Sequence, residues 1–264
     1  MTNPLASLWR QGRRTRNGWL SIPSPLVAEI MARAGWDSIT VDMQHGMLGF
    51  DQLLPVLQAM SATPVVPIVR VPWREPGICM KVLDAGALGI ICPMVNNREE
   101  AAELVSFCRY PPDGVRSFGP TRAALVHGGT YARTANDTVL VLAMIETAPA
   151  VEQLEEIVTT PGLDGVYVGP ADLSLSLGFG HGFDHEDEAR LAVIRRIVET
   201  ARAHGRFAGI HCGTPAYARR MWELGFHFIS LQTDARLLAA KCAEVLAALD
   251  PQGPPAGASS ESVY

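Results

Sequence analysis

Cysteine is scarce in this sequence, and lysine is scarcer still. The five cysteines never form a Cys-x-x-Cys pair; they are Cys79, Cys92, Cys108, Cys212 and Cys242. Their odd number and wide scatter argue against a disulfide framework and a structural zinc site, and favour reduced, packed thiols. The lysines are Lys81 and Lys241 alone. Chemistry that needs a lysine amine therefore has few candidates.

Long apolar runs are also missing. No stretch approaches the ~18 consecutive apolar residues that a membrane-spanning helix needs. The N-terminal segment MTNPLASLWRQGRRTRNG has no apolar core of signal-peptide length. We expect a cytoplasmic protein that does not contact membranes.

Positive charge is not in surplus. The net charge is −5 and the isoelectric point about 5.8, which argues against nucleic acid as a partner and favours small molecules. With 264 residues, 48% of them hydrophobic, the chain can bury a large core. We expect one domain over residues 1–250 and a disordered tail over residues 251–264, where turn-forming residues dominate.

Short apolar runs alternate with helical patterns along the chain. Eight runs are expected to be strands, over residues 19–22, 38–42, 65–71, 89–94, 139–145, 166–168, 207–210 and 226–231. Four junctions repeat the order helix end, glycine, strand, with Gly35, Gly86, Gly162 and Gly225 as expected left-handed caps. Eight such units predict a (β/α)8 barrel of the TIM type, an α/β fold. An open doubly wound sheet would need a G-x-G-x-x-G turn, which the first strand lacks.

Residues 111–135 depart from this pattern. The segment is rich in glycine, proline and polar residues, and it is long for a connection in such a barrel. We expect it to be a functional loop on the catalytic face.

Two of the predicted strands end in a carboxylate. Glu146 follows one strand, and Asp172 follows the next along the chain. Parallel strands joined by a helix present their carboxyl ends on the same rim, so the two acids should converge there. Two oxygen ligands suit Mg²⁺ or Mn²⁺ better than a metal that prefers thiolates. Either acid alone could equally cap a helix or hold an arginine.

Other polar residues belong to the same rim. His45 follows the second strand and is suited to general acid or base work. Arg70 ends the third strand among apolar neighbours and needs an anion beside it, either a structural carboxylate or a substrate oxygen. The turn GPADLS should start a helix whose amides, at Ala171 and Asp172, could receive a carboxylate.

Together these groups suit a 2-oxo acid, with the metal chelated by its oxygens and the arginine stabilising an enolate. No lysine ends a predicted strand, so a Schiff-base mechanism lacks its nucleophile. His211 follows the seventh strand and could face either the rim or the core. Trp19 could line the substrate pocket or belong to the core.

These stretches resemble the HpcH/HpaI family of metal-dependent class II pyruvate aldolases. The resemblance extends over residues 19–249 and rests on VDMQHG, VRVPW, LDAGALGIICPMVNNREEA, RYPPDGVRSFGP, MIET and LDGVYVGPADLSLSLG. It implies a (β/α)8 barrel that uses Mg²⁺, Mn²⁺ or Co²⁺. The implied reaction is reversible cleavage of a 4-hydroxy-2-oxo acid to an aldehyde and pyruvate, or a close analogue such as hydroxypyruvate.

The resemblance also implies a role for each matching residue. Glu146 and Asp172 match the metal ligands, and His45 matches the proton acceptor. Arg70 matches the transition-state stabiliser, which also contacts the substrate. Asp84 matches the acid that raises the basicity of the histidine. Ala171 and Asp172 match the amides that bind the pyruvate carboxylate.

Two positions depart from the family. Met144 stands where a glutamine is common, and Gln44 stands where a glutamate often precedes the histidine. These changes leave the substrate open. A citryl-CoA or malyl-CoA type lyase remains an alternative, as does a catalytically silent ligand-binding relative.

The last predicted helix has more apolar surface than one barrel can cover, which indicates that the protein forms an oligomer. Residues 235–249 are apolar on more than one face, whereas the outer helix of a barrel needs a single apolar stripe. We expect a homo-oligomer, and the resemblance implies a hexamer. Asp84 follows a helix and so should lie at the opposite end of the barrel from His45. A contact between the two would then require a neighbouring chain.

Overall fold

The computed structural model describes residues 2–250, and in these residues the chain forms a closed barrel of eight parallel strands. Each strand pairs with the next, and β8 pairs with β1. The strands are β1 (Thr15–Leu20), β2 (Ser38–Asp42), β3 (Val66–Arg70), β4 (Gly89–Cys92), β5 (Leu140–Ile145), β6 (Gly165–Val168), β7 (Phe207–Cys212) and β8 (Phe228–Leu231). The predicted fold is confirmed. The predicted tail lies outside the described residues.

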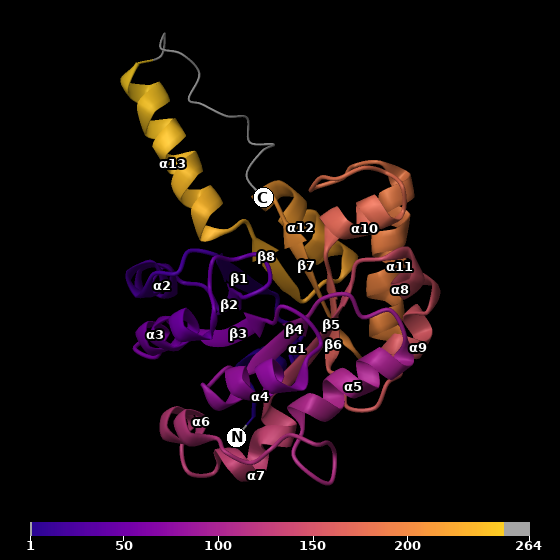
Figure 1. Cartoon of the computed structure of the whole chain (residues 1–264). Helices are drawn as coiled ribbons and strands as arrows, with labels where there is room; N and C mark the ends of the chain where they lie inside the picture. The colour runs from indigo at the N-terminus through magenta and orange to yellow at the C-terminus, as the bar shows by residue number, and fades with distance from the viewer. Residues whose placement is uncertain (1, 251–264) are drawn as a thin grey trace.

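Helices surround the strands (Figure 1). They are α1 (Pro4–Arg10), α2 (Pro25–Ala32), α3 (Phe50–Met60), α4 (Pro76–Asp84), α5 (Arg98–Cys108), α6 (Thr121–His127), α7 (Tyr131–Thr138), α8 (Ala148–Glu152), α9 (Leu154–Val158), α10 (Pro170–Ser176), α11 (Glu188–Ala203), α12 (Pro215–Leu224) and α13 (Asp234–Leu249). In the described part of the chain, no helix has the length and apolar character to cross a membrane.

Local sequence explains where the helices begin and end. Several begin with proline after a capping side chain, as where the hydroxyl of Thr214 accepts from the amide of Tyr217 at the start of α12. The four junction glycines all have positive φ, from 81° at Gly162 to 108° at Gly225. The predicted left-handed conformation is therefore confirmed at each of them.

Strand β1 begins earlier than its apolar residues predicted. Its first half is polar: Thr15 and Asn17 are buried, and Arg16 between them is exposed. The amide group of Asn17 donates to Thr40 at 3.0 Å and to Ser230 at 2.8 Å. These partners belong to the neighbouring strands β2 and β8, so polar residues can form this strand because the barrel interior satisfies them.

The amino end of the barrel is closed by α1. Leu5, Ala6 and Trp9 are buried, and the Trp9 ring lies 4.9 Å from Phe207 and 5.3 Å from Phe228, between ring centroids. A filled amino end leaves the carboxyl ends of the strands as the open face, where barrels of this type bind ligands.

The predicted position of residues 111–135 was wrong. This segment connects α5 to β5 and forms α6 and α7 at the amino end of the barrel, away from the open face (Figure 1). There His127 bonds the carbonyl of Gly86 at 2.8 Å, and the exposed Phe118 packs on Tyr110. A segment between a helix and the following strand must lie at the amino ends of the strands, so chain direction excludes the catalytic face.

Candidate active site

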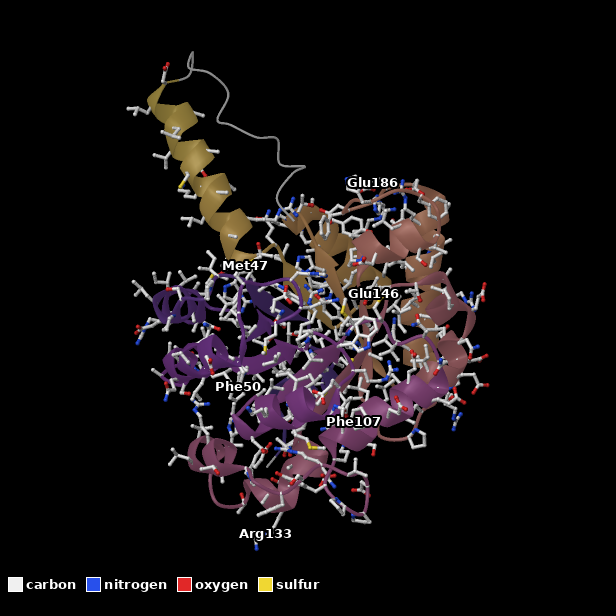
Figure 2. All side chains as sticks on the ribbon, in the orientation of Figure 1. Met47, Phe50, Phe107, Arg133, Glu146 and Glu186 are labelled. Carbon is white, nitrogen blue, oxygen red and sulfur yellow. The ribbon has the colours of Figure 1, made fainter. Side chains whose placement is uncertain are left out.

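A cavity opens at the carboxyl ends of the strands. It encloses about 620 Å³, counting the part open to solvent, which suits a small molecule. Its lining residues come from the ends of seven strands and from the segments that follow them: Trp19, Ser21, Asp42, His45, Arg70, Met144, Tyr167, Gly169, Pro170, Ala171, Asp172, Phe183, His211, Thr233 and Arg236. Figure 2 shows Glu146 well separated from Arg133, which lies on α7 at the other end of the molecule.

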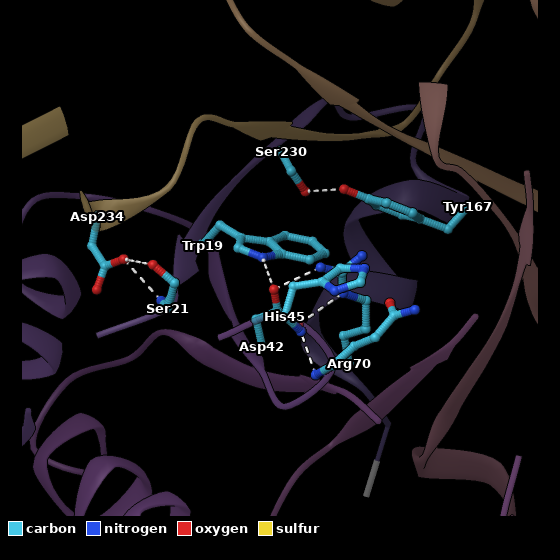
Figure 3. A network of polar contacts seen from close by, with 9 residues as sticks. Trp19, Ser21, Asp42, His45, Arg70, Tyr167, Ser230 and Asp234 are labelled. Carbon is cyan, nitrogen blue, oxygen red and sulfur yellow. Dashed lines mark hydrogen bonds and ion pairs between the residues drawn. The ribbon is translucent and has the colours of Figure 1, made fainter. Parts of the chain in front are cut away.

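Arg70 forms a buried ion pair with Asp42 of the neighbouring strand. Its Nε donates to Oδ1 at 2.9 Å and its Nη2 to Oδ2 at 2.6 Å. The indole of Trp19 donates to the same carboxylate at 3.1 Å, and the guanidinium lies 4.9 Å from the centroid of the Trp19 ring (Figure 3). Burial opposes ionisation of Asp42, but the bonds and charge of Arg70 outweigh it and lower the pKa of that carboxyl. The sequence predicted an anion beside Arg70, either a structural carboxylate or a substrate oxygen. The structure shows a structural carboxylate, that of Asp42.

His45 lies in the loop that Asp42 holds in place. The backbone amides of Gln44 and His45 donate to Oδ1 of Asp42 at 3.0 and 3.3 Å. Partial burial and the charge of Arg70 lower the pKa of His45, while Asp42 and Asp172 oppose that shift. A histidine with a lowered pKa is neutral near pH 7, the form that accepts a proton.

Glu146 has one bonded and one orphaned oxygen. Its Oε1 accepts from the amide of Met94 at 2.7 Å. Its Oε2 is buried without a hydrogen-bond partner among residues 2–250. Burial raises the pKa of Glu146 to about 7, and the charge of Asp172 adds to this effect. A buried carboxylate oxygen without a hydrogen bond is suited to bind a cation. The cation would supply the missing partner, and its charge would offset the cost of burial and the repulsion from Asp172.

Gly169 provides the room beside that oxygen. A Cβ at this position would lie 2.5 Å from Oε2 of Glu146 and 2.9 Å from Cε of Met144. The described residues contain no group of three or more His, Cys, Asp or Glu side chains arranged to hold a metal. Magnesium commonly binds through one or two carboxylates and completes its shell with water and substrate. Glu146 and Asp172 therefore fit such an ion.

Helix α10 starts beside these acids, at Pro170, as the sequence predicted. Its cap is Gly169, so no side chain bonds its first amides. The backbone amides of Ala171 and Asp172 lie in this first turn, where an amide has no partner within the helix. They are positioned to receive an anion.

Asp84 is not in this cavity. It ends α4, and its Oδ1 accepts from Nη2 of the buried Arg116 at 2.6 Å. Within one chain, Asp84 and His45 lie at opposite ends of the barrel, as chain direction predicted. A role for Asp84 beside His45 has no support inside a single chain, and a role through a neighbouring chain stays a prediction.

Sequence reasoning left several cavity residues unassigned. Asp42 could have been identified, since it ends the strand next to that of Arg70. Phe183 and Thr233 lie in connections and Arg236 lies in the first turn of α13, and none of them belongs to a recognisable motif. His211 faces the cavity, with its ring edge-on to Trp19 at 5.0 Å between centroids. Burial lowers the pKa of His211 to about 3, so this ring is neutral.

Comparison with known proteins gives consistent matches. The model of the HpcH/HpaI aldolase/citrate lyase family matches residues 18–240. A hydroxypyruvate/pyruvate aldolase of Rhizorhabdus wittichii is 42% identical over 93% of this chain and 98% of that protein. A 4-hydroxy-2-oxo-heptane-1,7-dioate aldolase of Salmonella dublin is 37% identical over 94% of each chain. The crystal structure of a family member from Burkholderia cenocepacia superposes with a TM-score of 0.88 at 33% identity, covering 94% of this chain and 99% of that one.

Proposed function

The chain belongs to the HpcH/HpaI aldolase/citrate lyase family, and from this premise we propose that it is a divalent-metal-dependent aldolase. Its reaction is the reversible cleavage of a 4-hydroxy-2-oxo acid to an aldehyde and pyruvate, or a close analogue such as hydroxypyruvate. The observation that carries this proposal is the orphaned oxygen of Glu146 beside Asp172, at the cavity that also holds His45 and Arg70.

Binding of the 2-oxo acid is assigned to the β5–β6 side of the cavity. Glu146 and Asp172 would hold Mg²⁺, Mn²⁺ or Co²⁺. Bound there, a divalent cation polarises the 2-oxo group of the substrate as a Lewis acid. The amides of Ala171 and Asp172 receive the substrate carboxylate, and the start of α10 favours that negative charge.

The chemical step is assigned to His45 and Arg70. In cleavage, the neutral imidazole of His45 accepts the proton of the 4-hydroxyl group as the bond between C3 and C4 breaks. The electron pair of that bond passes to the 2-oxo group and forms an enolate. Arg70, held rigid by Asp42, stabilises the negative charge that develops on this oxygen. Lys81 and Lys241, in α4 and α13, line no part of the cavity, which agrees with a mechanism without a Schiff base.

Removal of metal tests the proposal. The enzyme is incubated with a 4-hydroxy-2-oxo acid after treatment with EDTA, and then with Mg²⁺, Mn²⁺ or Co²⁺ added back. Cleavage should be lost and then restored. Full activity in EDTA, or trapping of the enzyme by borohydride with pyruvate, would contradict the mechanism.

A parallel assay addresses the alternatives. Turnover of acetyl-CoA with glyoxylate, without turnover of pyruvate with any aldehyde, would favour the lyase that acts on CoA esters. Inactivity in both assays, with intact binding of pyruvate, would favour a silent ligand-binding relative.

We also propose that the chain forms a homo-oligomer, in the form of a hexamer. Within α13, Asp234 is the buried residue, and the helix stands away from the barrel (Figure 1). Leu238, Val245, Leu246 and Leu249 are between 54% and 81% exposed. An apolar surface of this kind is typical of a contact with another subunit.

A further inference from the structure

The segment between β4 and α5 contains a strained backbone conformation. Met94 has φ 56°, in the left-handed region where a residue with a Cβ is rarely found. Such strain persists only where the surrounding structure enforces it, and it is common at functional sites. The backbone amide of Met94 donates to Oε1 of Glu146 at 2.7 Å. The strained residue therefore holds a proposed metal ligand through its own backbone.

The side chain of Asn96 holds Met94 in this conformation. Its amide group donates to the backbone carbonyl of Met94 at 3.0 Å. Its carbonyl oxygen accepts from the hydroxyl of Thr147, which is the residue after Glu146. Both ends of the Asn96 side chain are thus used, and the contacts close a ring through Met94, Glu146, Thr147 and Asn96.

Two further sets of contacts hold this ring in place. The backbone amide of Asn96 donates to Oε2 of Glu100 at 2.7 Å, and Oε1 of Glu100 accepts from Arg74, after β3, at 3.2 Å. The hydroxyl of Thr147 accepts from the amide of Ala150 at 3.1 Å and so caps α8. The position of Asn96 is therefore fixed by the start of α5 on one side and by the start of α8 on the other.

The bond from Met94 decides which oxygen of Glu146 is left for a cation. A carboxylate held by no other group turns easily about its last torsion and can present either oxygen. The bond to Oε1 removes that freedom, and Oε2 is buried without a hydrogen-bond partner among residues 2–250. Groups that hydrogen-bond to a metal ligand orient it and strengthen metal binding.

We propose that Asn96 is a positioning residue for the divalent cation, because it holds Met94 in the left-handed conformation from which the Met94 amide fixes Glu146. The inference rests on the proposed metal-dependent function and adds to it a residue outside the described lining of the cavity. Asn96 contacts neither cation nor substrate. It acts through Met94 and Glu146.

The test measures binding of Mn²⁺ alone, without substrate, from the EPR signal of the free ion. Asn96→Ala should weaken Mn²⁺ binding by about 10- to 100-fold, as is typical when the partner of a metal ligand is lost. Asn97→Ala is the matched control. The side chain of Asn97 caps α5 by accepting from the amide of Glu100 at 2.9 Å, so its loss should lower the Tm and leave the affinity for Mn²⁺ unchanged.

A second pair of substitutions tests the backbone conformation itself. Glycine adopts positive φ without strain, so Met94→Gly added to Asn96→Ala should recover part of the lost affinity for Mn²⁺. Met94→Ala added to Asn96→Ala keeps a Cβ and should recover none. Equal affinities in these two double variants would overturn the inference. Unchanged affinity in Asn96→Ala would do the same, as would equal losses in Asn96→Ala and Asn97→Ala, since a general disturbance of the segment would give that result.

The unmodified protein separates this inference from the proposed function. Binding of Mn²⁺ without cleavage of any 4-hydroxy-2-oxo acid would contradict the aldolase function alone, and the affinities of the variants would still decide the role of Asn96. Absence of Mn²⁺ binding in the unmodified protein would overturn both.

Discussion

Arg70 and Asp42 show how a single ion pair organises the residues of the site. Asp42 accepts from the side chains of Arg70 and Trp19 and from the backbone amides of Gln44 and His45. Asp42 therefore orients the guanidinium of Arg70, which is proposed to stabilise the enolate, and the loop that carries the proposed base His45. Removing one member of a buried pair leaves an uncompensated charge, which typically costs about 3–5 kcal/mol. Variants of Arg70 thus affect stability as well as chemistry.

His45 and Arg70 are predicted to act at different steps. His45→Ala should slow aldol cleavage by about 10²- to 10⁴-fold, as expected for a lost general base. It should retain exchange of the methyl protons of pyruvate, because Arg70 and the metal still stabilise the enolate. Arg70→Ala should lose both activities. Cleavage is followed by release of pyruvate, and exchange by NMR in D₂O.

A matched control separates chemistry from stability. Arg109 is buried and forms an ion pair with the partly buried Asp164 at 2.8 Å, at the amino end of the barrel. Arg109→Ala should lower the free energy of unfolding without changing kcat of the folded enzyme. If the His45 and Arg70 variants show identical, mild losses in both assays, the division of roles is wrong.

At the scale of elements, the β6–α10 turn brings the proposed metal and carboxylate sites together. Gly169 has φ −96°, which any residue can adopt. The glycine is therefore needed for space and not for backbone conformation. Its missing side chain leaves room for Oε2 of Glu146 from β5. The following turn presents the amides of Ala171 and Asp172.

Gly169→Ala should weaken metal binding. The new Cβ would lie 2.5 Å from Oε2 of Glu146 and displace that carboxylate, so the Mg²⁺ concentration for half-maximal activity should rise by about 10- to 100-fold. Gly129→Ala is the matched control, because a Cβ there meets nothing within 4 Å. An unchanged metal requirement in Gly169→Ala would rule out Glu146 as a ligand in this geometry.

At the scale of the whole molecule, α13 links assembly to the site. Its cap Thr233 and its first-turn residue Arg236 line the cavity, and its other end carries exposed apolar side chains. A subunit that packs on those side chains would hold the helix in place from its far end.

We predict that the unmodified protein is an oligomer, and a hexamer by resemblance to its family. Combined Leu238→Glu, Val245→Glu and Leu246→Glu substitutions should produce smaller species, since buried charges destabilise an apolar contact. Lys241→Glu changes charge on the same helix at an exposed position and is the control. Light scattering gives the mass. A fully active monomer at micromolar concentration in the unmodified protein would refute the prediction.

The barrel and the strand-end acids were predictable from sequence because they depend on short-range features. Hydrophobic periodicity, glycine caps and chain direction act within a few residues, and they determined the eight strands, the shared rim of Glu146 and Asp172, and the remote position of Asp84. Residues 111–135 were predicted wrongly because their composition is typical of a functional loop. Their place between a helix and the following strand requires them to lie at the amino ends of the strands.

Tertiary structure alone decided which side chains meet. Asp42 and Arg70 are 28 positions apart, and Ser21 and Asp234 are 213 apart. Such pairs form only because the barrel closes β8 against β1 and stacks neighbouring strands in register. No local pattern contains that information. The sequence by itself thus determined the fold and the proposed metal site, whereas the partner of Arg70 and the location of Arg236 depended on the closed barrel.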